Sequence, residues 1–178
     1  ADFVLRKKGD LLTLFTKKTA YEIPRDITKV GKFAFSSCSK LKSVTLHGKP
    51  KPLLKDSLAG CKSLKTVVLQ PDVKAVEWLA LARGNIQTVV LADGTQVRIY
   101  DLFMYNCFTQ SEAGIGFDYA KAAQRWQEVK KESSRFQFCL ELLTEHLAEC
   151  GEQGKAIADF AIRYCLGKGD GKTLQTIL

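Results

Sequence analysis

The feature that most constrains the fold of this chain is a near-copy of one nine-residue segment. CSKLKSVTL, at Cys38–Leu46, recurs 23 residues later as CKSLKTVVL, at Cys61–Leu69. A shorter third copy, GNIQTVVL at Gly84–Leu91, follows after a further 22 residues. Upstream, ITKVGKFAF at Ile27–Phe35 matches VKAVEWLAL at Val73–Leu81 at an offset of 46, two periods away. A period of about 20 to 50 residues is the signature of a repeat architecture, which therefore sets the fold class.

The apolar frame of the repeat predicts a short strand in each copy. Within LKSVTL, alternation places Leu41, Val44 and Leu46 toward a core and Ser43 and Thr45 outward. We expect strands at 41–46, 64–69 and 86–91 to be adjacent, in that order. Stacking would then form two internal columns: Leu41, Leu64 and Ile86 in one, and Leu46, Leu69 and Leu91 in the other. No single unit can bury its own apolar side, so the stack predicts a short solenoid with a small parallel sheet on one face.

The first copy, with its flanks, resembles a known repeat family. IPRDITKVGKFAFSSCSKLKSVTLHG, at residues 23–48, is similar to the repeat of BspA-like bacterial leucine-rich repeat proteins. The matching positions are Ile23-Pro24, Ile27, Val30-Gly31, Ala34-Phe35, Cys38 and Leu41. The second copy departs, with Leu54 for the glycine and Ser57-Leu58 for Ala-Phe, and the third keeps Ala80-Leu81 but loses the cysteine. The resemblance covers about residues 3–100. It implies a leucine-rich repeat fold and a role in adhesion or interaction, and it offers the cell surface as a location.

Beyond residue 100 the pattern becomes helical, after a last turn and strand around Asp93-Gly94. Asp118 is placed to cap a helix over 119–131, with Tyr119, Ala122, Ala123, Trp126 and Val129 on one face. We therefore expect an α/β chain with two parts: a leucine-rich repeat solenoid at 1–100, capped by a helical region at 101–178.

Two further helices are expected in that region. Ser133 or Ser134 can cap the first of them, over 135–150, and Gly151 can end it. Its inward positions are predicted to be Phe136, Cys139, Leu140, Leu143 and Leu147. The second, KAIADFAIRYCL, is expected to end at Gly167, and a short apolar segment follows it.

Charge is unevenly distributed along the chain, whose net charge is +8. Residues 1–65 carry 15 Lys and Arg against 5 Asp and Glu, whereas the remaining residues carry 12 against 14. The basic part could attract acidic protein, phosphate, anionic polysaccharide or nucleic acid. A solvated lysine surface is the plainer interpretation. Lysines outnumber arginines and few aromatic residues lie among them, so nucleic acid is not favoured. No apolar run reaches the ~20 residues that a transmembrane helix requires.

The six cysteines include no CxxC pair, which argues against a zinc ribbon or a thioredoxin-like motif. We expect six buried thiols without disulfides, which favours an intracellular location over the surface location that the resemblance implies. Cys139, His146 and Cys150 share one side of a predicted helix, but one helix seldom completes a four-coordinate metal site. We therefore expect no metal and no cofactor.

Other motifs argue against an enzyme. GKGDGKT, at Gly167–Thr173, lacks the first glycine of a phosphate-binding loop and follows a helix, so an interhelix turn is expected there. His47, beside Gly48, has no accompanying signature of a nucleophile.

The function predicted is therefore a non-catalytic interaction module that binds a protein or a glycan through the repeat sheet. The candidate face consists of Lys42, Ser43, Thr45, Lys65, Thr66, Val68, Gln87, Thr88 and Val90. Small hydroxyls and valines on a flat strip suit an extended contact, although threonine is also simply a good strand residue. Two alternatives remain open: electrostatic binding of an anionic polymer through the basic part, and a structural spacer within a longer protein.

Overall fold

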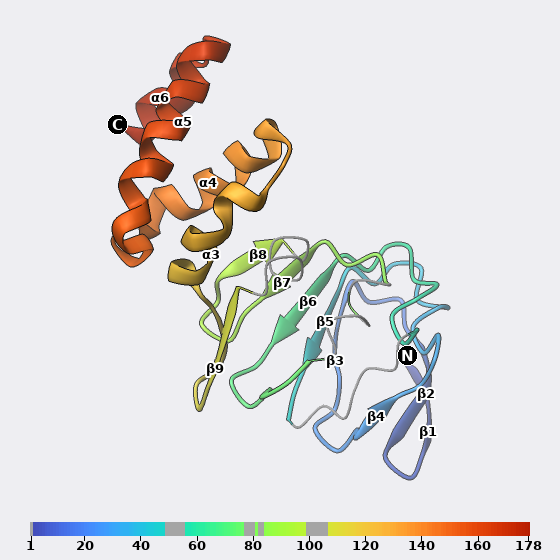
Figure 1. The fold of residues 1–178 in the computed structure, drawn as a ribbon. Helices are drawn as coiled ribbons and strands as arrows, with labels where there is room; N and C mark the ends of the chain where they lie inside the picture. The colour runs from blue at the N-terminus through green and yellow to red at the C-terminus, as the bar shows by residue number, and fades with distance from the viewer. Residues whose placement is uncertain (1, 49–55, 77–80, 82–83, 99–106) are drawn as a thin grey trace. The chain divides into compact units, whose positions relative to one another are not determined.

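The computed structural model describes residues 2–48, 56–76, 81, 84–98 and 107–178, with the backbone alone for 143–145. The chain divides into two compact units, Ala1–Phe117 and Asp118–Leu178 (Figure 1). The domain boundary expected from the sequence, at 100/101, falls in a stretch outside the described residues. The unit boundary lies further along the chain, directly before the Asp118 helix cap.

The described residues of the first unit form three sheets. The three-stranded sheet has the order β1-β2-β4, with β1 at Phe3–Lys7, β2 at Asp10–Phe15 and β4 at Lys29–Val30. The five-stranded sheet has the order β3-β5-β6-β7-β8, with bounds Ala20–Glu22, Ser43–Leu46, Thr66–Leu69, Thr88–Val90 and Gln96–Arg98. A hairpin of β9 (Phe108–Ser111) and β10 (Gly114–Phe117) follows.

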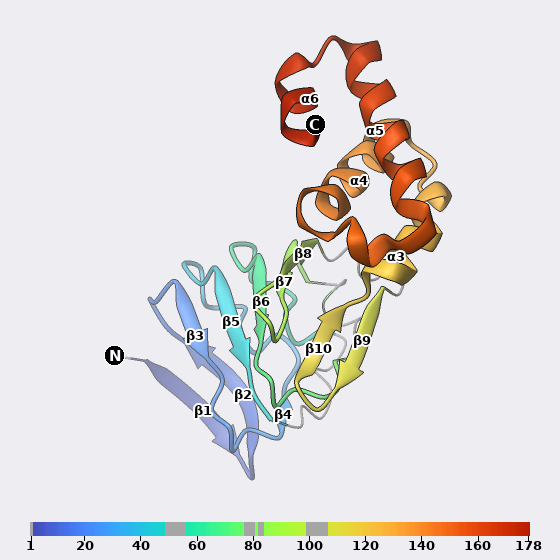
Figure 2. The same ribbon diagram turned by 90° about the vertical axis from the view of Figure 1, so that its left-hand side faces the viewer.

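The repeat strands β5, β6 and β7 are adjacent, mutually parallel and in the predicted order (Figure 2). Val44 pairs with Val67, and Val67 pairs with Val89. The sheet as a whole is mixed, which corrects the expectation of a parallel sheet. A turn at Asp93-Gly94 reverses the chain, so β8 runs antiparallel to β7. This reversal is local because a two-strand hairpin needs only a short turn, whereas a parallel connection needs a long crossover.

The core of this unit contains the columns that the repeat predicts. Leu41, Leu64 and Ile86 are buried, and so are Leu46, Leu69 and Leu91. Between these two columns lies a third, formed by Val44, Val67 and Val89, which are fully buried. Alternation along each strand thus directs one side chain in two into the core, as strand geometry requires.

Buried polar groups join one repeat to the next. The Cys38 thiol donates to the Leu14 carbonyl, and the Cys61 thiol donates to the Cys38 carbonyl, each at 3.1 Å. The third repeat lacks the cysteine, and the Asn85 side-chain amide instead donates to the Cys61 carbonyl at 3.4 Å. Ser57 donates to the Val30 carbonyl at 2.8 Å. The eroded repeats therefore still satisfy buried carbonyls, as burial demands.

The β9–β10 hairpin belongs to the first unit. The Ala92 amide donates to the Ile115 carbonyl at 3.2 Å. Gly114 has φ +106°, and a Cβ there would lie 2.6 Å from the Ala92 Cβ. Only glycine permits so close an approach of the two segments.

The second unit is helical, as predicted. It contains α3 (Tyr119–Arg125), a 3-10 turn at Trp126–Glu128, α4 (Glu132–His146), a 3-10 segment at Ala148–Gln153, α5 (Gly154–Lys168) and α6 (Gly171–Ile177). The Asp118 side chain accepts from the Lys121 amide at 2.9 Å, which confirms the predicted cap. Among the described residues, no helix is long and apolar enough to cross a membrane.

Several details of the helical prediction are wrong. Ser133 and Ser134 lie inside α4, because this helix begins at Glu132 and not at the predicted residue 135. The residue before the helix, Lys131, makes no side-chain cap. Leu147 is exposed, because α4 ends at His146 and the chain bends through Gly151, with φ +57°. The side chain of Leu143 lies outside the described residues.

The third predicted helix runs past Gly167 and ends at Gly169, whose φ of +66° is the left-handed helix cap. Asp170 then caps α6 by accepting from the Thr173 amide at 3.0 Å. The segment GKGDGKT is thus the end of one helix and the start of the next, which confirms the interhelix turn.

A candidate interaction face on the repeat sheet

Two rows of outward side chains cross the five-stranded sheet. Strand register places Ser43, Thr66 and Thr88 in one row, and Thr45, Val68 and Val90 in the next. All six are partly exposed, whereas the residues between them in each strand are buried. The six predicted strand positions therefore form one continuous surface.

The three predicted flanking residues lie directly before these rows. The backbone ladder continues to them, because the Lys65 amide donates to the Lys42 carbonyl and the Gln87 amide to the Lys65 carbonyl. Lys42 and Gln87 are exposed and Lys65 is half-buried. All nine predicted residues thus lie together at one side of the sheet.

The sequence reasoning missed the two ends of each row. Ala20 pairs with Ser43 and Glu22 pairs with Thr45, so β3 extends both rows at one edge. Arg98 and Gln96 extend them at the other edge, opposite Thr88 and Val90. One signal was present: Ala20 and Glu22 precede Ser43 and Thr45 by the same 23-residue period. The antiparallel β8 has no such signal, because it lies outside the repeat.

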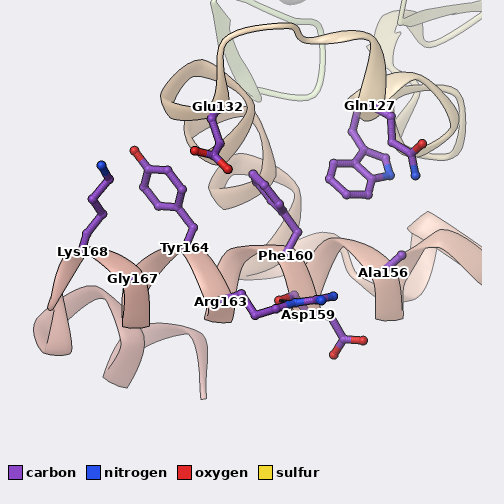
Figure 3. A pocket seen from close by; sticks show the side chains of 10 residues that line it. Gln127, Glu132, Ala156, Asp159, Phe160, Arg163, Tyr164, Gly167 and Lys168 are labelled. Atoms are coloured by element: carbon purple, nitrogen blue, oxygen red, sulfur yellow. Dashed lines mark hydrogen bonds between the residues drawn. The ribbon is translucent and has the colours of Figure 1, made fainter.

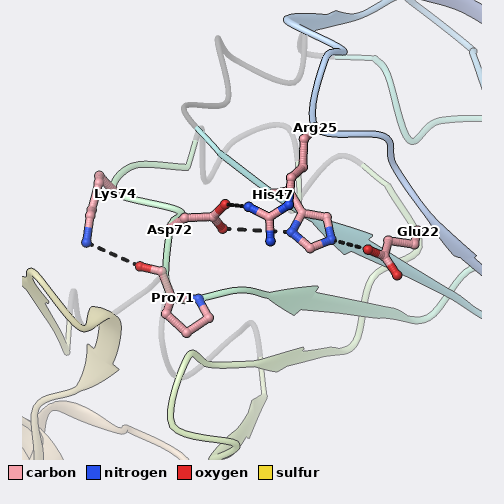
Figure 4. Close-up of polar contacts among 6 residues, drawn as sticks. All are labelled: Glu22, Arg25, His47, Pro71, Asp72 and Lys74. Atoms are coloured by element: carbon pink, nitrogen blue, oxygen red, sulfur yellow. Dashed lines mark hydrogen bonds and ion pairs between the residues drawn. The ribbon is translucent and has the colours of Figure 1, made fainter.

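A charged cluster lies at one end of this face (Figure 4). His47 follows β5, and its side chain is only 6% exposed. Its Nε2 lies 2.5 Å from Glu22 Oε1, and its Nδ1 lies 3.9 Å from Asp72 Oδ1. Arg25 forms an ion pair with Asp72 on the other side. The cluster joins segments from three successive repeats at the carboxyl ends of their strands.

Electrostatics in this cluster favours the ionised form of Asp72. Partial burial opposes ionisation, but the Gly48 amide, Arg25 and His47 outweigh it and hold the pKa of Asp72 below its ordinary value. Among the described residues, His47 Nδ1 and Asp72 Oδ1 have no hydrogen-bond partner. His47 is oriented by carboxylates on both sides and, in the described part of the chain, forms no hydrogen bond to a serine or cysteine side chain. Its geometry is that of a link between repeats.

Lys74 forms hydrogen bonds to backbone carbonyls outside the candidate face. Its ammonium donates to the carbonyls of Pro71, Ser111 and Glu112, and so connects the segment after β6 to the turn between β9 and β10. Figure 4 shows the contact with Pro71. This lysine acts as a structural donor to backbone carbonyls.

The helical unit has a cavity of about 690 Å³ beside α5 (Figure 3). Phe160 and Tyr164 point into it from one face of α5, with Glu132 opposite and Lys168 at one end. Arg163 and Asp159 also line it, so its charges are mixed. Such a lining does not define one class of ligand.

The cysteine and histidine residues predicted to share one helix are divided between two elements: Cys139 and His146 lie in α4, whereas Cys150 lies in the following 3-10 segment. Their side chains form contacts within the protein. His146 stacks on Tyr119 with ring centroids 3.6 Å apart, and its Nδ1 lies 3.2 Å from Glu149. The Cys150 thiol donates to the His146 carbonyl at 3.2 Å, and burial raises the pKa of Cys139 to about 12. Within the ranges that the structure describes, no three His, Cys, Asp or Glu side chains are arranged to hold a metal ion.

All six cysteines lie within the described residues, and each is buried. None forms a disulfide in this structure. Burial raises the pKa values of Cys38, Cys150 and Cys165 as well, because an apolar environment disfavours the thiolate. These thiols therefore behave as small core residues.

Comparison with known proteins identifies the repeat. No curated protein matches the chain, and no solved structure matches it. A family model described as BspA type leucine rich repeat region (6 copies) matches residues 15–111, which is more than half of the chain. The matched range includes the repeat strands β5, β6 and β7 and the buried Cys38 and Cys61. The chain belongs to the BspA-type leucine-rich repeat family.

Proposed function

We propose that the protein is a non-catalytic interaction module whose repeat stack forms a short solenoid and binds a partner protein through the outward face of the five-stranded sheet. The observation that carries this proposal is the pair of side-chain rows in register across the sheet. The family match supports it, because leucine-rich repeats use stacked units to present an extended binding surface.

The chemistry of the face favours an extended protein segment over a small molecule. Its centre consists of threonine and valine side chains of similar length, which we expect to form a flat strip. Small-molecule sites are concave and bury most of their ligand, which a flat strip cannot do. Hydroxyls at Ser43, Thr45, Thr66 and Thr88 can donate and accept, so they can follow the polar backbone of a partner as well as a glycan.

The central strand offers the sharpest test. Val68→Arg places a long charged side chain in the middle of the face, between Thr45 and Val90. Thr109→Arg, on the exposed surface of β9, is the matched control. Binding of both variants is measured against a displayed peptide library and a glycan array. We expect Val68→Arg to abolish the interactions of the unmodified protein and Thr109→Arg to leave them unchanged; equal binding by both variants would refute the proposal.

The salt dependence of the affinity distinguishes binding through the sheet face from electrostatic binding of an anionic polymer. The excess of positive charge in residues 1–65 favours the electrostatic alternative. A binder of an anionic polymer that makes several phosphate or sulfate contacts loses about 10³-fold or more in affinity between about 50 and about 200 mM salt. The affinity of a partner bound through Thr66, Val68 and their neighbours should change far less with salt. A steep salt dependence that is unaffected by Val68→Arg would assign binding to the basic surface instead.

A further inference from the structure

The first unit exposes an apolar face that the proposed function does not use. Eight large hydrophobic side chains are exposed among the described residues, and five of them lie within the first 33 positions. We define the apolar face as these five: Phe3 at 60% exposed, Leu5 at 47%, Leu12 at 36%, Phe15 at 49% and Phe33 at 52%. Single exposed hydrophobic residues are ordinary, but a cluster of this kind marks an interaction surface.

Strand register places Phe3 beside Phe15, and alternation along β1 places Leu5 on the same side. Phe3 pairs with Phe15 across β1 and β2, and paired residues lie on the same side of a sheet. Leu14, directly before Phe15, is fully buried. A β-bulge opposite Leu5 and Arg6 interrupts the alternation, so Leu11 is also buried and Leu12 is exposed.

The segment after β4 runs alongside β2, because the Leu14 amide donates to the Ala34 carbonyl at 2.7 Å. Phe33 lies in this segment, and its ring is close to Gly60 of the next repeat. Figure 2 shows β1 at the edge of this sheet.

Exposed lysines lie on the same strands and connecting segments as the apolar face. Lys7 and Lys29 both pair with Asp10 in strand register, so two cations flank one carboxylate at one end of the sheet. Two other nearby cations are already neutralised, Arg6 by Asp26 and Lys18 by Asp2. The exposed lysines of this region that form no ion pair with another described residue are Lys7, Lys8, Lys17, Lys29 and Lys32.

This combination indicates what covers the face. A second copy of the chain would bring the same cations to the contact, and like charges repel. Interfaces between proteins are depleted of lysine, whereas the same strands and connecting segments here carry exposed lysines. A lysine can bury its aliphatic stem beside apolar groups while its ammonium reaches a phosphate. Lysine clusters next to an apolar surface are attracted to anionic lipid.

We propose that the apolar face and these exposed lysines dock the protein peripherally on an anionic lipid surface, with Phe3, Phe15 and Phe33 entering the headgroup layer. This contact is separate from the binding face on the five-stranded sheet. Val68→Arg, which blocks that face, should therefore leave lipid binding unchanged.

Vesicle sedimentation tests the proposal with the full chain. Phosphatidylcholine vesicles with and without phosphatidylserine serve as probes. We expect binding only where phosphatidylserine is present, and a loss of about tenfold or more in partitioning for the double variants Phe3→Ser/Phe33→Ser and Lys7→Gln/Lys29→Gln. The matched controls are Leu166→Ser, an equally exposed leucine on α5, and Lys155→Gln/Lys172→Gln, which removes the same charge from the helical unit. Both controls should bind as the unmodified protein does, and circular dichroism checks that each variant is folded.

Four outcomes would overturn the proposal. They are no binding to either vesicle, equal binding to both, an equal loss in the lysine controls, and a concentration-dependent dimer that Phe3→Ser/Phe33→Ser abolishes. The dimer would show that a second copy covers the face. A fluorescent polyglutamate peptide is the remaining probe: binding that requires the same phenylalanines, without vesicle binding, would assign the face to an acidic protein partner.

Discussion

Two phenylalanines, two positions apart, allow the repeat core to be tested with identical chemistry. Phe35 is 0% exposed and Phe33 is 52% exposed. A buried aromatic side chain covers roughly 150–250 Å², and about 25 cal/mol is gained per Å² removed from water. Truncation at Phe35 also leaves a cavity, so Phe35→Ala should lower the free energy of unfolding by about 3–5 kcal/mol. Phe33→Ala removes the same atoms from a half-hydrated site without a closed cavity, and should cost roughly 1–2 kcal/mol.

The assay must report on the first unit alone, because the two compact units need not unfold together. Amide hydrogen exchange in β5 and β6 gives the stability of the repeat stack directly. Lys42→Ala, at an exposed position, should change it by well under about 1 kcal/mol. Equal losses for Phe35→Ala and Phe33→Ala would show that Phe35 does not lie in the core, and the stacking argument would fail.

Further predictions concern backbone, capping, pH and thiol reactivity. Gly114→Ala should lower the free energy of unfolding by roughly 2–5 kcal/mol, because φ is +106° and the added Cβ would meet Ala92. Gly94→Ala, with open space around the added Cβ, should lower it by only about 1–2 kcal/mol. Thermal denaturation measures both. Asp118→Ala should destabilise α3 by about 1 kcal/mol, while Asp118→Asn should retain the cap; an equal loss in helical signal for both would contradict this. Hydrogen bonds from the Thr173 hydroxyl and amide lower the pKa of Asp170. The stability that Asp170 adds to α6 is therefore present above the unfolded pKa of about 3.9 and is lost as the pH falls through the lower folded pKa. Amide hydrogen exchange in α6 should show this pH dependence, and Asp170→Asn should remove it. Burial raises the pKa of Cys139 to about 12, so thiol titration near neutral pH should proceed slowly in the folded protein and count six thiols after unfolding without reductant; four or fewer would indicate disulfides.

The proposed sheet face shows how far a repeat can be read from sequence. Because side chains alternate along a strand, the spacing of Val44, Val67 and Val89 was enough to predict which neighbours face outward. The register between strands followed from the same period, since equivalent residues of stacked units pair with one another. The hydrogen bond from Asn85 to the Cys61 carbonyl was not foreseen. Asn85 is equivalent to Ser63, which donates to the Cys38 carbonyl, so a different side chain keeps this bond where the third repeat lacks the cysteine.

The helical unit was less predictable. The Asp118 cap could be identified because a carboxylate directly precedes a helical pattern and accepts from its first turn. The start of α4 could not, because the chain begins that helix at Glu132 without any side-chain cap. Gly167 and Gly169 are equally plausible stops by sequence, and only the packing of the preceding turn selects the one that adopts a left-handed conformation.

The repeat family, the order of the repeat strands and the buried side of each strand were predictable from the sequence alone, because they depend on spacing within a local pattern. Contacts between dissimilar segments were not, and they became known only from the folded chain. Tertiary structure paired β8 with β7 in the opposite direction, brought His47 between Glu22 and Asp72, and placed the segment after β4 alongside β2. These partners are not equivalent positions of the 23-residue repeat. Their proximity follows from the path of the chain. Hydrophobic patterning predicts which residues enter the core, but it does not predict this path.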